Sequence, residues 1–332
     1  MLDHFAKTAK IVGLGSFLPE RILTNSDLEA MVETTDEWIR SRTGIRERRV
    51  VAEGEALVDL VARAGRAALE DAGVEPEEVD LLILATATVE QPIPATAAIV
   101  QPMLGLVNAV CFDLSAACSG FTYALNVGRQ FIATGEAETI LVVGAECLTR
   151  YIDWTDRATC VLFGDGAGAV VLKPGQPGEG ILHLKWRTDG TYSDIISMPG
   201  GGSRFPPSST ASIEKRLPFI KMRGNETFKI AVRSLTEISR EVMDAAGIGV
   251  DDLDLFIPHQ ANMRIIQAVG HRLGLSDEQV FTNVERVGNT SAASIPLAMV
   301  DARDQGRLKP GSLLLTSAFG GGLTWASSLI RM

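Results

Sequence analysis

The chain repeats itself at a fixed spacing, and this repeat limits its fold more than any other feature. Residues 79–84 resemble residues 253–257, and Asp80 and Asp254 are 174 positions apart (254 minus 80). In both copies, apolar residues at three- and four-residue helical spacing and an Ala-Gly pair precede the matching run. Residues 139–144 match residues 312–317 in the same way. Such a repeat predicts two related halves.

Each half has the pattern of a helix, a glycine stop, a turn and a buried strand. Helices that alternate with continuous apolar strands indicate sheets with helices on both faces. We therefore expect an α/β fold in which two halves, residues 1–175 and 176–332, pack as a layered pseudo-dimer. Residues 199–218 are rich in Gly, Pro and Ser, which predicts a loop between the halves that lines a cleft.

Composition excludes several classes of function. The formal net charge is −10, whereas proteins that bind nucleic acid normally carry a basic face. No apolar run approaches the roughly 18 residues that a membrane span needs. The first ten residues lack the apolar core of a signal peptide. We expect a cytoplasmic protein with neither a nucleic acid nor a membrane as partner.

Cys118 has the sequence environment of a nucleophile. The four cysteines show no C-x-x-C spacing and are too few for a disulfide scaffold. Cys118 follows a strand-like run, has small neighbours that leave room for a substrate, and begins a helical run. The N-terminus of a helix favours an anion, which predicts a lowered thiol pKa. Position alone equally allows a buried cysteine that closes a tight turn.

A nucleophilic cysteine needs a base or an electrostatic partner, and the chain has only four histidines. His4 lies in the terminus, His183 alternates with apolar residues as on the polar face of a strand, and His271 looks like an exposed helix residue. His259 instead follows the buried run 255–258. The carboxyl end of such a strand is where α/β folds place ligands, so His259 is the candidate.

The small polar segment 288–294 occupies, in the second half, the place that the Cys118 loop occupies in the first. A pseudo-twofold relation between the halves would bring Asn289 close to Cys118. Taken alone, Asn289 is better explained as a turn residue.

Glycine-rich segments argue against a nucleotide-binding fold. Residues 13–18 and 164–169 both miss the spacing of the dinucleotide fingerprint, and no Gly-Lys pair is present for a phosphate-binding loop. Residues 319–325 better suit a backbone that approaches a substrate oxygen and donates N–H bonds to it.

Together these motifs resemble the β-ketoacyl-acyl carrier protein synthase III family of thiolase-like condensing enzymes, over nearly the whole chain. The motifs lie at residues 13–20, 36–39, 42–48, 118–121, 163–169, 258–262 and 288–294 and in the loop at Gly320. The resemblance implies a duplicated thiolase-like fold with αβαβα layers. Chain-elongating relatives use two histidines, and this chain has none in residues 288–290. Relatives of chalcone synthase and hydroxymethylglutaryl-CoA synthase also use Cys, His and Asn, but Trp38, Arg42 and the 258–262 motif favour synthase III.

The resemblance implies a Cys118–His259–Asn289 triad and ping-pong acyl transfer. Cys118 takes an acyl group from acyl-CoA, and the backbone N–H groups of Cys118 and Gly321 form the oxyanion hole. Malonyl-acyl carrier protein then loses CO₂ while His259 and Asn289 stabilise the enolate, and a 3-ketoacyl product results. No cofactor and no metal are expected.

The resemblance also implies binding residues. CoA would contact Trp38 and Arg157 around its adenine, Arg42 near its phosphates and Asn225 by its pantetheine. The acyl pocket would include Leu148, Phe163 and Met222, with Ile93 supplied by the partner subunit of a homodimer. Since an acyl carrier protein is acidic, a basic patch would bind it, with Lys221, Arg223, Lys229 and Arg264 as candidates. Each of these four fits an ordinary solvated charge equally well.

The sequence does not decide in which pathway the enzyme acts or which primer it uses. The expected role is to initiate fatty acid synthesis. One alternative is a related Cys-His-Asn condensing enzyme or acyltransferase of secondary metabolism, and another is a non-catalytic acyl-CoA-binding protein. Ile93 is smaller than an aromatic ring, which hints at room for a branched or longer primer.

Overall fold

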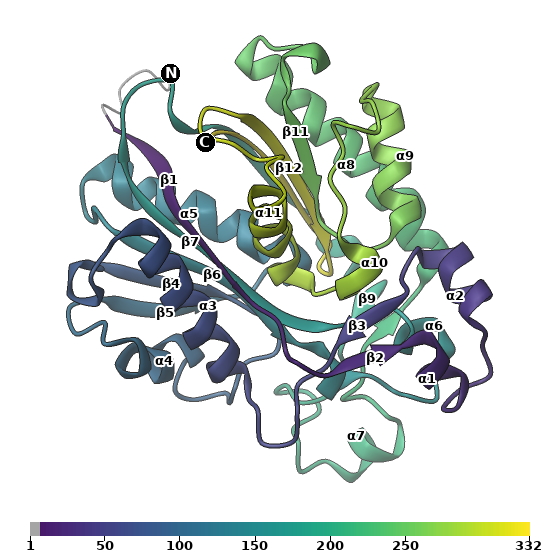
Figure 1. Ribbon diagram of the computed structural model, residues 1–332. Helices are drawn as coiled ribbons and strands as arrows, with labels where there is room; N and C mark the ends of the chain where they lie inside the picture. The colour runs from purple at the N-terminus through teal and green to yellow at the C-terminus, as the bar shows by residue number, and fades with distance from the viewer. Residues whose placement is uncertain (1–6) are drawn as a thin grey trace.

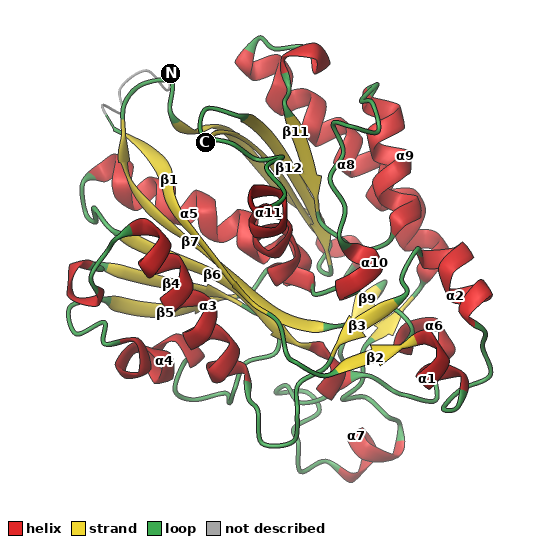
Figure 2. Cartoon of the chain, viewed as in Figure 1, coloured by secondary structure: helices red, strands yellow, loops and turns green. Residues whose placement is uncertain are grey.

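The computed structural model describes residues 7–332 and contains two main sheets, each built from one half of the chain (Figures 1 and 2). The first has the order β1-β7-β6-β4-β5, with β1 (Thr8–Phe17), β4 (Leu81–Ala85), β5 (Val110–Leu114), β6 (Ile140–Cys147) and β7 (Asp165–Gly175). The second has the order β11-β12-β13-β8, with β8 (Gly180–Thr188), β11 (Leu255–Pro258), β12 (Leu313–Gly320) and β13 (Thr324–Arg331). The chain passes from one sheet to the other between Gly175 and Gly180.

Helices cover both faces of each sheet, as expected. The outer layers are α3 (Leu57–Ala72) and α4 (Thr96–Leu104) on the first sheet, and α8 (Gly224–Ala246) and α9 (Met263–Leu273) on the second. Between the sheets lie α5 (Gly120–Thr134) and α11 (Ser294–Asp304), whose apolar residues join those of both sheets in one core (Figure 2). The layers are therefore αβαβα. None of the helices within residues 7–332 is long and apolar enough to cross a bilayer.

The predicted repeat is visible in the elements themselves. Helices α5 and α11 start at Gly120 and Ser294, 174 positions apart (294 minus 120). Strands β4 and β11 start at Leu81 and Leu255, the same distance apart (255 minus 81). The second half lacks a counterpart of β5, because beside β11 only Val280 forms a single bridge, to Phe256. The first sheet is thus one strand wider.

Local sequence explains how these elements begin and pack. Asp59 accepts a hydrogen bond from the Ala56 N–H at 2.9 Å at the start of α3, and Gly73 ends the helix with φ +61°. A Cβ at Gly15 in β1 would lie 2.2 Å from the Ala68 nitrogen of α3. Apart from Gly164, the glycines of the 13–18 and 164–169 segments lie in strands β1 and β7 and let helices approach, which fits the absence of a nucleotide motif.

Shorter elements gather at one end of the layers (Figure 1). They are β2 (Ile22–Thr24), α1 (Asn25–Glu29), α2 (Asp36–Thr43), β3 (Glu47–Arg49), α6 (Arg157–Cys160), β9 (Ile196–Ser197), β10 (Lys221–Met222) and α10 (Val284–Val287). Two 3₁₀ turns, η2 (Ala117–Ser119) and η6 (Ser291–Ala293), lead into α5 and α11.

The segment 199–218 is mostly loop, as predicted, and includes the short helix α7 (Thr210–Glu214). The expectation that it lines a cleft is wrong, because none of its residues borders the main cavity of the described chain. The Gly200 N–H donates to the Leu217 carbonyl at 2.8 Å. The segment therefore closes on itself and projects away from the layers at α7 (Figure 1).

Candidate active site

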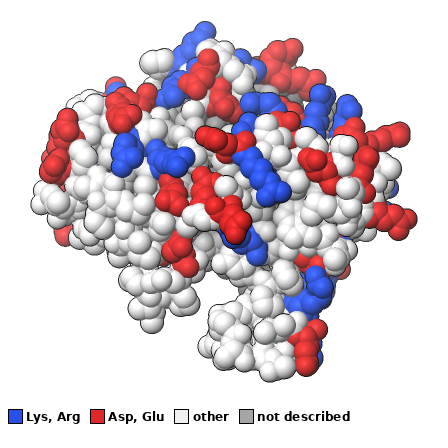
Figure 3. Space-filling model, turned by 60° about the horizontal axis from the view of Figure 1, so that its bottom comes forward, with Lys and Arg blue, Asp and Glu red and all other residues white. Residues whose placement is uncertain are grey.

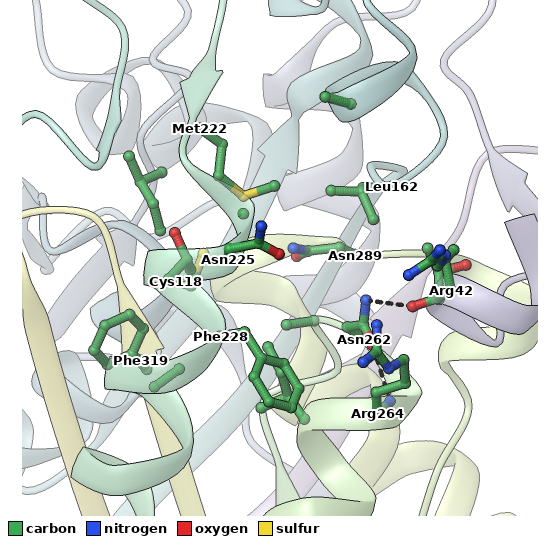
Figure 4. Close-up of a pocket in the computed structure, with 18 of the residues that line it drawn as sticks. Arg42, Cys118, Leu162, Met222, Asn225, Phe228, Asn262, Arg264, Asn289 and Phe319 are labelled. Atoms are coloured by element: carbon green, nitrogen blue, oxygen red, sulfur yellow. Dashed lines mark hydrogen bonds between the residues drawn. The ribbon is translucent and has the colours of Figure 1, made fainter.

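A cavity of about 540 Å³ receives side chains from both halves of the chain. Ten of the predicted site residues line it: Trp38, Arg42, Cys118, Phe163, Met222, Asn225, Lys229, His259, Arg264 and Asn289. Figure 4 shows Cys118 and Phe319 on one side of the cavity and Arg42, Asn262 and Arg264 on the other. The fold therefore joins a cysteine, a histidine and an asparagine from three separate sequence motifs.

Cys118 lies in the turn η2, one turn ahead of α5, rather than in the helix itself. The preceding residue, Ala117, has φ +47°, a left-handed conformation that costs energy in a residue with a side chain. Burial, with a smaller contribution from the Glu146 carboxylate, raises the pKa of the Cys118 thiol to about 12, although the Ser291 side chain opposes the rise. The predicted lowering of this pKa is wrong, because enclosure of the thiol outweighs the favourable groups. Enclosure therefore favours the neutral thiol over the thiolate in the free enzyme.

His259 follows β11 and is buried, and burial lowers its pKa to about 3, so its ring is neutral. Its Nδ1 lies 2.6 Å from the Ser294 Oγ, which also accepts a hydrogen bond from the Gln260 N–H at 3.3 Å. The Ser294 proton is then free to be donated to Nδ1, which leaves the proton of the neutral ring on Nε2. The ring is a hydrogen-bond donor toward the cavity. Sequence reasoning missed this role of Ser294, since the contact exists only in the fold.

Asn289 is held at both its backbone and its side chain. Its N–H donates to the Leu162 carbonyl at 2.8 Å, and its carbonyl accepts from the Gly164 N–H at 3.0 Å. Its Oδ1 accepts from the Ser291 N–H at 2.9 Å. The side-chain amide is thereby oriented with its NH₂ group left to donate, so Asn289 supplies a second donor beside Cys118.

The other histidines play no part in this cavity. His183 lies in β8 and His271 on the exposed face of α9, as their sequence contexts predicted. His4 lies outside the described residues. Within residues 7–332 no three His, Cys, Asp or Glu side chains form a group that would hold a metal ion.

The glycine loop after β12 packs directly on the nucleophile's turn. A Cβ added at Gly320 would lie 2.6 Å from the Cys118 nitrogen and 3.1 Å from the Ser119 nitrogen. Only glycine allows this approach, which keeps the loop backbone next to the Cys118 N–H. The predicted oxyanion donor Gly321 is the next residue.

Gly320→Ala is expected to displace the turn that holds Cys118. A misplacement of about 1 Å in a reacting group costs on the order of 10² in rate, so acyl transfer to Cys118 should fall by about that factor. Gly190→Ala is the matched control, because a Cβ at Gly190 meets nothing within 4 Å. Acylation rates and melting temperatures of both variants check this prediction, and equal acylation by both would contradict it.

Trp38 and Arg157 contact each other, so no space for an adenine ring is open between them. The Arg157 guanidinium lies 4.7 Å from the centre of the Trp38 ring, and its Nη1 donates to the Glu33 carbonyl at 3.0 Å. The guanidinium itself therefore covers a face of the indole. The expected sandwich needs these two groups to part, and Arg157 lies behind Trp38 rather than in the cavity lining.

Besides Arg157, five predicted residues do not line the cavity within residues 7–332: Leu148, Ile93, Lys221, Arg223 and Gly321. Leu148 is buried in the hydrophobic cluster that also contains Phe163, so it supports the cavity wall instead of forming it. Ile93 is 85% exposed and lies outside the cavity of its own chain. Arg223 pairs with Asp194 at 2.5 Å and with Glu226 at 3.8 Å, which neutralises it in part.

Comparison with known proteins decides the family. Residues 112–190 match the family model described as 3-Oxoacyl-[acyl-carrier-protein (ACP)] synthase III, and residues 243–332 match the model of its C-terminal region. A protein of Caldanaerobacter subterraneus named Beta-ketoacyl-[acyl-carrier-protein] synthase III is 50% identical over 323 residues, 97% of each chain. The chain belongs to the β-ketoacyl-[acyl-carrier-protein] synthase III family.

Solved structures agree with this membership of the synthase III family. The crystal structure of 3-oxoacyl-[acyl-carrier-protein] synthase III from Aquifex aeolicus has 45% identity and a TM-score of 0.91, and the match covers 98% of this chain and all of that one. A priming β-ketosynthase of a polyketide biosynthetic pathway has 35% identity and a TM-score of 0.90, over 98% and 97% of the two chains. The thiolase-like fold and the enzyme class, a condensing acyltransferase, are confirmed. The non-catalytic alternative is set aside.

Proposed function

We propose that this synthase III condenses an acyl-CoA primer with malonyl-acyl carrier protein and so initiates fatty acid synthesis. The observation that carries the proposal is a single cavity lined by Cys118 together with two side chains that are fixed by hydrogen bonds, His259 and Asn289. The reaction needs no metal and no cofactor, because the primer arrives as an activated thioester. The geometry of this cavity supports the role proposed for each site residue.

The first half-reaction forms an acyl-enzyme. The Cys118 sulfur attacks the thioester carbonyl, and the oxyanion that develops is held by the N–H groups of Cys118 and Gly321. The close packing of Gly320 on the Cys118 turn supports this pairing of amides from the two halves. The S–H bond of Cys118 breaks as the S–C bond forms and its proton goes to solvent, while CoA leaves as its thiolate and takes a proton from solvent.

The second half-reaction uses the two donors. The malonyl group loses CO₂, and negative charge develops on its thioester oxygen. The His259 Nε2–H and the Asn289 NH₂ group donate to that oxygen. The resulting carbanion attacks acyl-Cys118, and the 3-ketoacyl chain leaves on the carrier protein while Cys118 is released as a thiolate and takes up from solvent the one proton that the whole reaction consumes.

Exposed cations line the cavity on the side away from Cys118, where the charged end of CoA would lie. They are Arg42, Lys229 and Arg264, and the Arg264 guanidinium lies 5.3 Å from the Phe228 ring centre. Phosphate groups favour such clusters. We place the adenine of CoA against Trp38, with Arg157 moving aside, and the pantetheine near Asn225.

Trp38→Ala is expected to raise the KM for acetyl-CoA about 10-fold and leave kcat unchanged, since stacking on a base contributes about 1–3 kcal/mol and acts far from the chemistry. An acyl-pantetheine thioester without adenine should show no such change. Trp186→Ala removes an exposed tryptophan outside the cavity and serves as the control. An equal rise in KM for both thioesters would contradict the adenine contact.

We place the surface that binds the carrier protein at the cations around the cavity. Lys229 and Arg264 border the cavity opening and so combine access with positive charge, whereas Lys221 and the paired Arg223 lie beside it. Figure 3 shows Lys and Arg interspersed with Asp and Glu on the face that it draws. An acidic carrier would therefore meet a local cluster, not a uniformly basic face.

We propose a homodimer formed at the β5 edge of the first sheet. β5 is the outermost strand of its sheet, and large apolar side chains near it are exposed: Ile93 at 85%, Val107 at 70% and Val110 at 66%. Exposed apolar patches and unpaired strand edges mark protein interfaces. In that dimer Ile93 would reach the acyl pocket of the partner, formed by Phe163 and Met222.

Ile93→Phe is expected to shift preference toward acetyl-CoA, because a larger side chain shortens the partner's acyl pocket. The measurement is kcat/KM for acetyl-CoA, isobutyryl-CoA and a longer acyl-CoA, with oligomeric state checked by sedimentation. Unchanged ratios among the primers in a dimeric variant would remove Ile93 from the pocket.

We further propose that the chain divides into two halves, residues 1–175 and 176–332. We also propose that the enzyme acts in the cytoplasm. The passage between sheets at Gly175 to Gly180 supports the division.

Mass spectrometry of the protein mixed with an acyl-CoA, without a malonyl donor, tests the proposed function. We expect one acyl group, located on the Cys118 peptide and removed by hydroxylamine. No adduct with any primer would overturn the proposal. The likeness to a priming ketosynthase makes secondary metabolism the second candidate, and a preference for malonyl-CoA over malonyl-acyl carrier protein would favour it.

A further inference from the structure

Two buried hydroxyl groups join the turn of Cys118 to the glycine loop after β12, and neither has a part in the mechanism proposed above. Ser119 in η2 is fully buried, and its Oγ donates to the Thr324 carbonyl at 2.9 Å. Thr324 is the first residue of β13, and its Oγ1 donates to the Ala116 carbonyl at 2.9 Å. Each hydroxyl thus reaches a backbone carbonyl of the opposite segment. This reciprocal pair, Ser119 and Thr324, is the hydroxyl clasp.

The hydroxyl clasp connects the two halves of the chain. Its two residues are 205 positions apart, and η2 contacts both β12 and β13. Both donor–acceptor distances lie in the normal range for O–H···O hydrogen bonds. A buried carbonyl that loses its donor is costly, because no water is present to replace the hydrogen bond. The clasp therefore opposes separation of the turn from the loop.

The turn needs such support, because it contains a residue in a costly conformation. Ala117 has φ +47°, and a left-handed residue with a side chain persists only where its surroundings enforce it. The clasp acts on both sides of this residue, at the Ala116 carbonyl and at the Ser119 hydroxyl. The Ser119 N–H also donates to the Ala116 carbonyl at 3.1 Å. Cys118 lies between these two fixed positions, so the direction of its N–H is set.

The glycine loop is held on two sides. Away from Cys118, the Leu323 N–H and carbonyl pair with the Asp189 carbonyl and N–H, both at 2.9 Å. Toward Cys118, the Thr324 Oγ1 lies 3.3 Å from the Gly321 carbonyl oxygen, in addition to its shorter contact with the turn. The Thr324 hydroxyl therefore lies between the segments that carry the Cys118 and Gly321 N–H groups.

We propose that the hydroxyl clasp sets the spacing of the Cys118 and Gly321 N–H groups, the two donors of the oxyanion hole. The inference rests on the acyl transfer proposed above. Within the described chain neither Ser119 nor Thr324 lines the cavity, and both hydroxyls donate to backbone carbonyls. They are positioning residues that act through the backbone.

The clasp bears on two of the three chemical steps. An oxyanion forms when the Cys118 sulfur attacks the primer thioester, and again when the carbanion attacks acyl-Cys118. Donors that are fixed before the reaction stabilise such an oxyanion best, because they need no rearrangement in the transition state. Malonyl decarboxylation uses His259 and Asn289 instead. Loss of the clasp should therefore slow acylation and condensation but spare decarboxylation.

The experiment measures single-turnover acylation by acetyl-CoA at several concentrations, by quenched mass spectrometry without a malonyl donor. In Thr324→Val and in Ser119→Ala the maximal rate should fall about 10-fold, less than the 10²–10³ for loss of a donor, since both donors remain and only their placement loosens. The half-saturating concentration should not change, because ground-state binding is untouched. Thr324→Ser keeps the hydroxyl and should restore the rate. Primer-free malonyl decarboxylation should persist in all three variants.

Alkylation by iodoacetamide separates the oxyanion hole from the thiol itself. The Cys118 sulfur displaces iodide in this reaction, and no charge develops on a carbonyl oxygen. Alkylation of the Cys118 peptide should therefore keep the rate of the unaltered enzyme in Thr324→Val and Ser119→Ala. An equal loss of alkylation and acylation would place the effect on the thiol and overturn the proposal.

Thr316→Val is the matched control for loss of a buried hydroxyl in the same strand pair. The Thr316 Oγ1 in β12 lies 2.7 Å from the Ser328 Oγ in β13, so this variant should lower the melting temperature but leave acylation unchanged. Unchanged acylation in both clasp variants would overturn the proposal, as would parallel loss of acylation, decarboxylation and thermal stability. Absence of acylation in the unaltered enzyme would instead overturn the proposed function itself.

Discussion

Cys118→Ala should abolish the acyl-enzyme and lower condensation by about 10⁴-fold or more, the scale on which enzymes lose rate when a nucleophile is removed. Cys118 is the only one of the four cysteines that lines the cavity within the described chain, so no other thiol is placed to take the acyl group. Cys118→Ser should do little better, because an enclosed hydroxyl is a far weaker nucleophile than a thiol at the same position.

Steady-state condensation and intact-mass measurements check this expectation. Cys111→Ser is the matched control, since Cys111 is a partly exposed thiol outside the cavity. Malonyl decarboxylation should persist in Cys118→Ala, because its donors are untouched. Acylation of the Cys118→Ala variant at any other residue, with turnover retained, would assign the nucleophile elsewhere.

His259→Ala and Asn289→Ala should each slow decarboxylation by about 10²–10³, the usual cost of one oxyanion donor, and leave acylation of Cys118 almost intact. Both side chains are fixed by a serine, through the Ser294 hydroxyl in one case and the Ser291 N–H in the other. Because they are aimed at one oxygen, the double variant should lose less than the product of the two single losses.

The pH dependence of decarboxylation supplies a second check on His259. Burial lowers the pKa of His259 to about 3, so the ring gains a proton only well below neutrality and is a neutral donor from about pH 5 upward. We expect its contribution to be constant between pH 5 and 8. A loss of decarboxylation centred near pH 6.5 that disappears in His259→Ala would show an ordinary, solvated histidine and contradict the assigned state. Ser294→Ala should weaken the donor without changing this profile.

The repeat in the sequence predicted most of the fold, since periodic apolar residues reflect burial directly. It correctly paired α3 with α8 and β4 with β11. It did not reveal that the second half lacks a strand equivalent to β5, because an absent strand leaves no pattern in the sequence. Ser294 and Ser291, which hold His259 and Asn289 in place, were named only as members of a small polar segment.

The sequence predicted which types of residue line the cavity, but it predicted the wrong direction for the pKa shift of Cys118. Position at a helix start suggested an acidic thiol at Cys118, but the degree of enclosure depends on the second half of the chain, which sequence spacing does not measure. Sequence spacing likewise did not show that the Arg157 guanidinium stacks on Trp38 and so fills the space expected for the adenine. In the sequence Glu146 is one residue of a buried strand, and only the packing of η6 on β6 brings that strand next to the turn that holds Ser291.

The paired left-handed residues Ala117 and Ser291 are 174 positions apart (291 minus 117), and the residues that follow them are Cys118 and Ala292. Two such turns meet where the pseudo-twofold axis passes. In an assembly of identical halves, any residue on that axis would face its own copy, and a cysteine would face a cysteine. Carrying both halves in one chain breaks this constraint. One turn is free to keep the thiol while the segment that leads into the other supplies the Asn289 amide donor, so two different reactants can be received at a single point that symmetry would otherwise have made uniform.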